Sequence, residues 1–395
     1  MAKLEKCNSM TKNHLKQKSK INFSEKNPTF STSFSSSVPD LSSLISFQDE
    51  SIRVNLKKYN SMEETKSLKK NQYILPERIC IREDITKKYR ISNHMLGDGA
   101  TAKVFLAEDF SGKKFAIKRI PKEKIEIRKK IILKEAEICC ILNNKNIIKY
   151  YGLYEDLNFV NVVMEKADTD LFELIVNNPL RYIPEYIAID FLIQIFEVIY
   201  YLHNVVNIVH CDIKPENFVV IFDKENGNKP ILKLIDFGNV RRKPKNKERL
   251  YNFVGTKEYM APEALENGGF NEKVDVWAAG IIMFNLLTGA DPFISPNSNN
   301  NDIDNENESD YYIDNIKFKP IKFEYIKNER LRELNKKLLN RYMAKRITAK
   351  EALEEIKLIK SELFNNNNIN NNRYINNYDK NWNIIINKLS LMNMS

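Results

Sequence analysis

Apolar residues recur on one face of a helix that the sequence predicts between about residues 124 and 142. The positions are Ile127, Ile131, Ile138 and Leu142, separated by four, seven and four residues. Because an α-helix has about 3.6 residues per turn, these intervals align the side chains along one stripe. The pattern therefore indicates a half-buried helix.

A second apolar stretch runs from Tyr186 to Val206 and is interrupted by polar residues at Asp190, Gln194 and Glu197. A membrane span requires about 20 predominantly apolar residues, and polar residues at this spacing break such a span. We therefore expect a core helix of a large helical lobe and no transmembrane segment.

The first 88 residues are expected to form a basic tail that does not fold alone. Up to residue 89 the chain holds 17 Lys and Arg against 10 Asp and Glu, so this part supplies most of the net charge of +10. Ser, Lys and Asn are frequent there, and little apolar surface is available for burial. Binding to nucleic acid or to an acidic membrane is the alternative. A disordered tail that can be phosphorylated is favoured, and no nucleic-acid partner is expected.

Two further segments, at residues 295–310 and 364–377, are rich in asparagine. Such runs are compositional and indicate no mechanism. The first is expected to be a surface insert, because surface loops tolerate insertions. The chain has five cysteines without a C-x-x-C pair, and no apolar run near residue 1 resembles a signal peptide. Both features favour an intracellular protein of the cytoplasm or nucleus.

The residues that carry chemistry stand in H-C-D-I-K-P-E-N at 210–217 and in D-F-G at 236–238. These motifs set a carboxylate, a lysine and an amide at fixed spacing, with a second carboxylate on a later turn. Phosphoryl transfer from a nucleotide to a hydroxyl needs an acid group that orients the hydroxyl, a cation, and oxygen ligands for magnesium. The segment resembles the catalytic loop and the magnesium-binding turn of eukaryotic protein kinases.

This resemblance implies the catalytic roles and the cofactors ATP and Mg²⁺. Asp212 would orient the substrate hydroxyl, and Lys214 would offset charge on the γ-phosphoryl group. Asn217 and Asp236 would hold Mg²⁺ through oxygen ligands. Lys118, in F-A-I-K at 115–118, would pair with the α- and β-phosphates. All of these residues are intact, which favours an active enzyme over a kinase-like scaffold that acts by binding partners.

Lys118 needs a carboxylate partner on the predicted helix. Counting back from N-N-K-N-I-I at 143–148, which resembles the family's N-H-P-N-I-I turn, selects Glu135. Glu137 is the alternative, and two residues further along a helix it would point to a different face.

The resemblance also implies an ATP site. Its glycine-rich loop comprises Leu96, Gly97, Asp98, Gly99, Ala100, Thr101, Ala102, Lys103 and Val104. Glycines there let backbone amides approach phosphate oxygens, and the third glycine of the family pattern is an alanine here. The other nucleotide-binding positions are Ala116, Lys118, Met164, Glu165, Ala167, Asp170, Val219 and Asp236. A dinucleotide-binding fold is the other interpretation of the glycines, but it requires repeating strand–helix units.

The C-terminal part of the domain continues the family pattern. G-T-K-E-Y-M-A-P-E at 255–263 resembles the stretch that closes the activation segment and receives the peptide. Arg346 resembles the arginine that pairs with the last glutamate of this stretch, Glu263, as an element of the fold. Lys214 and Thr256 match the Ser/Thr class, so we expect Ser and Thr acceptors in protein substrates.

Regulation and substrate preference follow from a few positions. Cys211 stands where many kinases have an arginine (a non-RD loop), and residues 239–255 contain no Ser or Thr. We therefore expect activity without phosphorylation of the activation loop. Glu216 and Asp170 match carboxylates of basophilic kinases and predict Arg or Lys two or three residues before the acceptor. The basic run at residues 241–249 favours acidic substrates instead.

The expected fold is α+β and bilobal, like that of protein kinases. A small lobe at 89–163 would contain a five-stranded antiparallel sheet and one main helix, and a hinge would follow at 165–167. A mainly helical large lobe would span 168–358 and carry the asparagine-rich insert at 295–310. Residues 359–395 would form a second tail. The nucleotide would lie in the cleft between the lobes.

Overall fold

The computed structural model describes residues 80–81, 84–99, 102–123, 135, 138–139, 142–178, 182–223, 225, 227, 229–246, 248–266, 268–293 and 308–366. Most of both predicted tails, and residues 295–307 of the predicted insert, lie outside the described residues. The described chain divides into two compact units. One contains the residues up to Asp170 together with Asn217–Val240, and the other contains Leu171–Glu216 and the residues from Arg241 onward.

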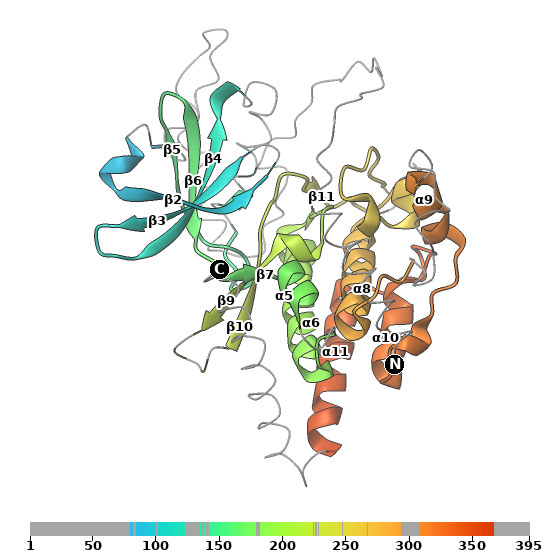
Figure 1. The fold of residues 1–395 in the computed structure, drawn as a ribbon. Helices are drawn as coiled ribbons and strands as arrows, with labels where there is room; N and C mark the ends of the chain where they lie inside the picture. Colours follow the sequence, from blue (N-terminus) through green and yellow to red (C-terminus); the bar gives the residue numbers. More distant parts are fainter. Residues whose placement is uncertain are drawn as a thin grey trace. The chain divides into compact units, whose positions relative to one another are not determined.

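The first unit is built on a six-stranded sheet in the order β1-β5-β6-β4-β3-β2 (Figure 1). Its strands are β1 (Cys80–Ile81), β2 (Tyr89–Asp98), β3 (Lys103–Asp109), β4 (Lys114–Pro121), β5 (Tyr150–Glu155) and β6 (Phe159–Glu165). The five antiparallel strands expected from the sequence are β2 to β6. The sixth strand, β1, lies before the predicted start of the domain and pairs in parallel with β5. A strand of two residues carries no periodic pattern, so hydrophobic periodicity does not predict it.

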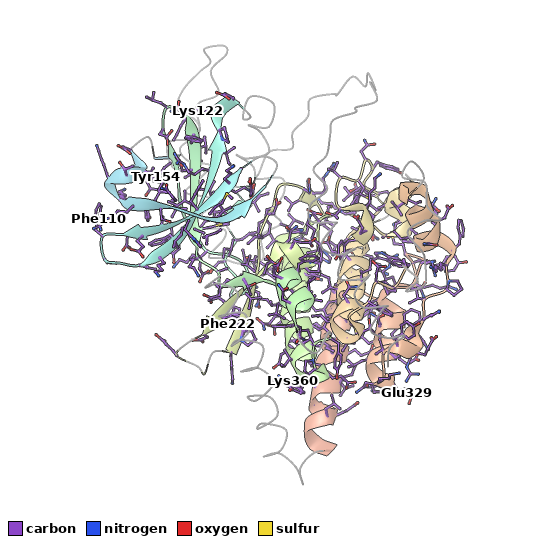
Figure 2. The ribbon with its side chains drawn as sticks, in the orientation of Figure 1. Phe110, Lys122, Tyr154, Phe222, Glu329 and Lys360 are labelled. Atoms are coloured by element: carbon purple, nitrogen blue, oxygen red, sulfur yellow. The ribbon has the colours of Figure 1, made fainter. Side chains whose placement is uncertain are left out.

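Aromatic residues form the core on one side of this sheet. The Tyr89 ring lies edge-on to Phe115, with centroids 5.1 Å apart, and to Tyr154 at 5.8 Å (Tyr154 is labelled in Figure 2). The buried cluster also contains Ile85, in the short helix η1 (Ile85–Lys87), together with Ala107, Ile117 and Val163. This packing fixes β4 and β6, the strands that carry several of the predicted nucleotide-binding residues.

A three-stranded sheet in the order β10-β9-β7 belongs to the same unit. Its strands are β7 (Thr169–Asp170), β9 (Phe218–Asp223) and β10 (Lys229–Leu234). Leu234 forms a parallel bridge with Ile147, just before β5, which connects the strands to the rest of the unit. Residues 236–238 follow β10 directly and are therefore held by the same framework.

The second unit is mainly helical. Its α-helices are α5 (Leu171–Asn177), α6 (Glu185–Tyr200), α7 (Pro262–Leu265), α8 (Lys273–Thr288), α9 (Glu308–Phe318), α10 (Glu329–Leu338) and α11 (Ala349–Asn366). Its shorter elements are η2 (Tyr201–Val206), β8 (Ile208–Val209), β11 (Arg241–Arg242), η5 (Lys257–Tyr259) and η6 (Phe323–Tyr325). The short helix η3 (Pro215–Asn217) begins in this unit, and its last residue, Asn217, belongs to the first. Together with the sheet unit, this arrangement confirms the expected bilobal α+β fold.

The predicted core helix is α6 with its continuation η2. Among the described residues, the stretch Glu185–Val206 is long and apolar enough to cross a membrane, judged by length and composition only. Its apolar side chains are buried in the helical unit, where α6 packs against α8 and α11. Asp190, one of the interrupting polar residues, accepts a 2.6 Å bond from Lys360 of α11 (labelled in Figure 2).

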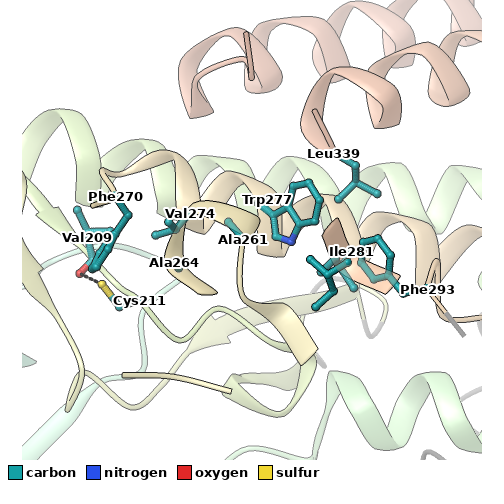
Figure 3. Packing of buried hydrophobic residues seen from close by; sticks show 11 residues of the cluster. Val209, Cys211, Ala261, Ala264, Phe270, Val274, Trp277, Ile281, Phe293 and Leu339 are labelled. Carbon is teal, nitrogen blue, oxygen red and sulfur yellow. Dashed lines mark hydrogen bonds between the residues drawn. The ribbon is translucent and has the colours of Figure 1, made fainter. Parts of the chain in front are cut away.

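A buried cluster around Trp277 attaches the predicted catalytic loop to α8 (Figure 3). The Trp277 ring stacks on Phe293 with centroids 5.8 Å apart. Val209 and Cys211, on either side of His210, belong to the same cluster and are fully or almost fully buried. Hydrophobic packing therefore fixes the backbone that leads into Asp212.

Candidate active site

Lys118 lies on β4 in the sheet unit and is paired with Glu135. Its Nζ atom is 3.2 Å from Oε1 and 3.3 Å from Oε2 of this carboxylate. Burial alone would lower the pKa of Lys118, but Glu135 and Asp236 outweigh it and raise the pKa above its ordinary value. The lysine is therefore a permanent cation, as a phosphate-binding residue must be. The alternative partner, Glu137, lies outside the described residues.

The strands β2 and β3 form the hairpin predicted for the glycine-rich loop. Gly97 is opposite Val104 and Asp98 is opposite Lys103, while the Gly99 N–H donates to the Ala102 carbonyl over 3.0 Å. A Cβ at Gly99 would lie 3.2 Å from that carbonyl oxygen, so the turn favours glycine. Ala100 and Thr101, at the tip, lie outside the described residues.

The remaining predicted nucleotide positions also lie in the sheet unit. Ala116 on β4 is buried and is opposite Met164 on β6, while Leu96 is exposed on β2. Val219 on β9 is opposite Asp170 of β7. Glu165 ends β6, where its N–H donates to Lys149 over 2.9 Å and its carboxylate lies 3.1 Å from Lys233. Ala167, two residues later, is partly buried.

Asn217 and Asp236 come from adjoining backbone in the sheet unit, because the Ile235 N–H donates to the Asn217 carbonyl over 2.9 Å. Asp236 has φ of +63°, a conformation uncommon for a residue with a side chain, and its carboxylate accepts from the Gly238 N–H over 3.2 Å. A carboxylate and an amide provide hard oxygen ligands, which suit Mg²⁺ together with substrate phosphates. Bound there, Mg²⁺ would neutralise phosphate charge.

Asp212, Lys214 and Thr256 form one cluster in the helical unit. Asp212 Oδ1 accepts from the Thr256 hydroxyl over 2.9 Å and from its N–H over 3.1 Å. Lys214 Nζ lies 3.4 Å from Asp212 Oδ2 and donates to the Thr256 hydroxyl over 2.7 Å. Burial would raise the pKa of Asp212, but Lys214, His210 and the Thr256 hydrogen bonds outweigh it and lower the pKa. The carboxylate is therefore ionised and oriented.

Asp275 of α8 fixes the backbone before Asp212. Its carboxylate accepts from the N–H groups of His210 (2.8 Å) and Cys211 (2.9 Å) and contacts Nε2 of His203 (2.8 Å). Cys211 has φ of +67°, a region that disfavours side-chain-bearing residues. These hydrogen bonds offset the strain and position the loop.

Thr256 and Asp275 are site residues that the sequence prediction did not include. Thr256 lies in the stretch at 255–263 that resembles the peptide-receiving segment, and Asp275 lies in the first turn of α8. Their contacts with the catalytic loop connect residues that are at least 44 positions apart in the chain. Local sequence spacing does not reveal such contacts.

The protein kinase domain family matches residues 90–356, and the chain belongs to this family. Known relatives include "Serine/threonine-protein kinase dkf-2" of Caenorhabditis briggsae, 32% identical over 58% of this chain and 19% of that protein. Calcium-dependent protein kinase 5 of Plasmodium falciparum is 37% identical over 58% of this chain and 39% of its own length.

Aurora kinase of Saccharomyces cerevisiae is 34% identical over 50% of this chain and 52% of its own length. The chain thus spans between 19% and 52% of the length of these three relatives.

Proposed function

We propose that the chain is an active serine/threonine protein kinase that transfers the γ-phosphoryl group of ATP to protein substrates. The observation that carries this proposal is the cluster of Asp212, Lys214 and Thr256. Asp212 is ionised and would receive or orient the proton of the attacking hydroxyl. Lys214, held by a hydrogen bond to Thr256 and an ion pair with Asp212, would offset negative charge that develops on the transferred group.

The sheet unit supports the same function. Lys118, protonated and paired with Glu135, would hold the phosphates of ATP. Asn217 and Asp236 would ligate Mg²⁺. A kinase-like scaffold without activity is the alternative, and the intact set of residues counts against it.

Radiolabel transfer from ATP to a basic protein tests the proposal, followed by phosphoamino-acid analysis. The Asp212→Asn variant should lose at least about 100-fold in rate, the size expected for removing a group that directs proton transfer. Asp314→Asn, an exposed carboxylate on α9, makes the same chemical change outside the cluster and should retain full activity. Equal rates for Asp212→Asn and wild type, or label mainly on tyrosine, would contradict the proposal.

We also propose that activity does not require phosphorylation of the activation loop. The residue before Asp212 is the buried, uncharged Cys211, whose thiol lies 3.8 Å from the Val209 carbonyl. The Thr256 hydroxyl is engaged with Asp212 and Lys214. A loop phosphate would therefore lack the usual arginine partner at position 211.

Residues 239–255 contain one side-chain hydroxyl that could be phosphorylated, that of Tyr251, which is 56% exposed. Phosphatase-treated wild type and Tyr251→Phe are compared with untreated enzyme. A fall of more than about tenfold in rate, some 1.4 kcal/mol of barrier, in either sample would refute independence from phosphorylation.

We also propose that preferred substrates have Arg or Lys two or three residues before the acceptor. This proposal is based on the acidic surface beside Asp212. Glu216 is exposed, yet surrounding protein desolvates its carboxyl and raises its pKa. Glu258 lies close enough to contribute to the same shift. A substrate arginine would offset both charges and bind bidentately.

The preference is tested by comparing phosphorylation rates of peptides that have Arg, Ala or Asp before the acceptor. Wild type should prefer Arg, and Glu216→Gln should reduce the preference about tenfold in KM, while the exposed Glu324→Gln should not. Selection of Asp over Arg by wild type would refute the idea.

A further inference from the structure

A basic pocket of about 270 Å³ lies on the helical unit, outside the residues assigned to catalysis. Its lining comprises Arg242, Lys243, Pro244, Lys245, Glu248, Arg249 and Leu250. Four of these residues are cations and one is an acid, so the lining carries a net charge of +3. The volume lies just below the usual range of small-molecule sites, which suits one compact charged group better than an extended ligand.

Part of this positive charge is not balanced by the described protein. Lys243 is engaged, because its Nζ lies 3.5 Å from Glu272 and donates to the His203 carbonyl. Within the described part of the chain, Arg242 and Lys245 form no ion pair through their side chains. Glu248, the acid in the lining, accepts from the Lys245 backbone N–H over 2.9 Å. Like charges held together repel, so an anion bound among them would be stabilised.

The backbone on both sides of the pocket is held by the helical unit. Arg242 on β11 is opposite Ile208 on β8. Leu250 exchanges two backbone hydrogen bonds of 2.8 Å with Phe270, and a Cβ at Gly269 would lie 2.8 Å from the Cβ of Arg249. Arg242 and the backbone at Arg249 and Leu250, at the two ends of the pocket, are therefore held in place, and an anion need not order these ends when it binds.

We propose that this pocket binds a phosphoryl group on a protein substrate that has already been phosphorylated at a residue other than the acceptor. The proposal rests on the kinase function proposed above and adds a substrate class to it. A phosphoryl group carries about −1.5 to −2 charges at pH 7 and three acceptor oxygens, whereas one carboxylate carries a single charge. Arg242 can bind it bidentately, and Lys245 and Arg249 can offset the remaining charge.

The position of the pocket explains why the bound phosphoryl group belongs to a substrate. Leu250, in its lining, precedes by six residues Thr256, whose hydroxyl bonds to Asp212 over 2.9 Å. A peptide anchored by its phosphate would therefore lie along the segment that leads to the catalytic carboxylate. Its acceptor hydroxyl would be presented to Asp212 at a raised effective concentration.

The chain itself contains a competing anion. Residues 295–310 carry five carboxylates, at Asp302, Asp304, Glu306, Glu308 and Asp310, and no Lys or Arg. Occupation of the pocket by this segment is the rival explanation, and the experiment includes it.

Fluorescence anisotropy with the full chain measures binding directly. Labelled peptides contain one serine acceptor and one phosphothreonine placed three to ten residues away on either side. The Asp212→Asn background is used, so that binding is read without turnover. At least one spacing should bind about tenfold more tightly than the same peptide with unmodified threonine. The double variant Arg242→Gln/Lys245→Gln should remove this gain in affinity. The control Lys327→Gln/Lys350→Gln loses the same amount of positive charge at exposed positions and should keep the gain.

A second measurement is steady-state phosphorylation of the same peptides by enzyme that keeps Asp212. The matching phosphopeptide should show about a tenfold lower KM with unchanged kcat, and the double variant in the pocket should lose only this KM advantage. Absence of a gain at every spacing, a gain that survives Arg242→Gln/Lys245→Gln, or an equal gain with glutamate in place of phosphothreonine would each overturn the proposal.

Two outcomes separate the inference from its competitors. If phosphopeptide binds only after Asp302→Asn/Asp304→Asn/Glu306→Gln, the chain's own acidic segment occupies the pocket and the proposal is wrong. If phosphopeptide binds but no phosphoryl transfer occurs, the proposed kinase function fails and the pocket stands as a binding site.

Discussion

Replacing Glu263 by glutamine should destabilise the helical unit strongly. Arg346 Nη1 and Nη2 bond to the two oxygens of this carboxylate over 2.7 and 3.0 Å, and the Arg346 side chain is completely buried. Glutamine keeps the shape but removes the negative charge, which leaves a buried guanidinium without its counter-ion. Breaking a buried pair on one side costs about 3–5 kcal/mol.

The remaining contacts of Arg346 place the expected loss near the lower end of this range. Its guanidinium also donates to the carbonyls of Asn340 and Lys273 over 3.0 Å each and lies 4.9 Å from the Trp277 ring centroid. These contacts persist in the variant. With about 2–4 °C per kcal/mol for a domain of this size, 3 kcal/mol corresponds to a fall of about 6–12 °C in Tm.

Thermal unfolding followed by circular dichroism measures the effect, and Glu362→Gln is the matched control. Glu362 also binds an arginine through two bonds, both 3.0 Å to Arg330, but this pair is exposed. Surface pairs contribute little, so the control should remain within about 2 °C of wild type. Equal shifts for the two variants would refute the reasoning from burial. Arg346→Met combined with Glu263→Met should recover part of the loss, because two apolar groups leave no unpaired charge.

Three further outcomes are expected. Gly255→Ala should lower kcat/KM by more than about tenfold, because a Cβ at this position would lie 2.5 Å from the Cys211 carbonyl oxygen. The control Gly268→Ala, whose Cβ would have nothing within 4 Å, should keep the wild-type kcat/KM. Similar kcat/KM values for the two variants would contradict this expectation. The lowered pKa of Asp212 gives stability that is present above its ordinary value of 3.8 and lost as pH falls through the folded value. Urea unfolding should therefore show the stability advantage of wild type over Asp212→Asn shrinking below pH 4, and a constant difference would count against it. Glu135→Gln should raise the KM for ATP several-fold more than kcat falls, and an unchanged KM would contradict its role.

The sequence by itself determined the class of fold and indicated the candidate site residues. Ordered motifs that resemble those of protein kinases pointed to Lys118, Asp212, Asn217 and Asp236, and each of these residues stands in a short local pattern. Counting back from residues 143–148, which resemble a turn of the protein kinase family, selected Glu135, and the structure places its carboxylate 3.2 Å from Lys118. The count runs over neighbouring residues of the chain, so the resemblance could indicate this partner without the tertiary structure.

Tertiary structure decided the features that depend on contacts between distant segments. The two-residue strand β1 has no pattern of its own and exists because β5 offers a free edge. Thr256 becomes part of the catalytic cluster only when the chain brings it to Asp212, 44 residues earlier. Asp275 supports the strained Cys211 across 64 residues. The cations of the basic pocket are neighbours in the chain, but the pairing of β11 with β8 is what holds Arg242 in place. Such contacts depend on long-range packing, which the local order of residues does not encode directly.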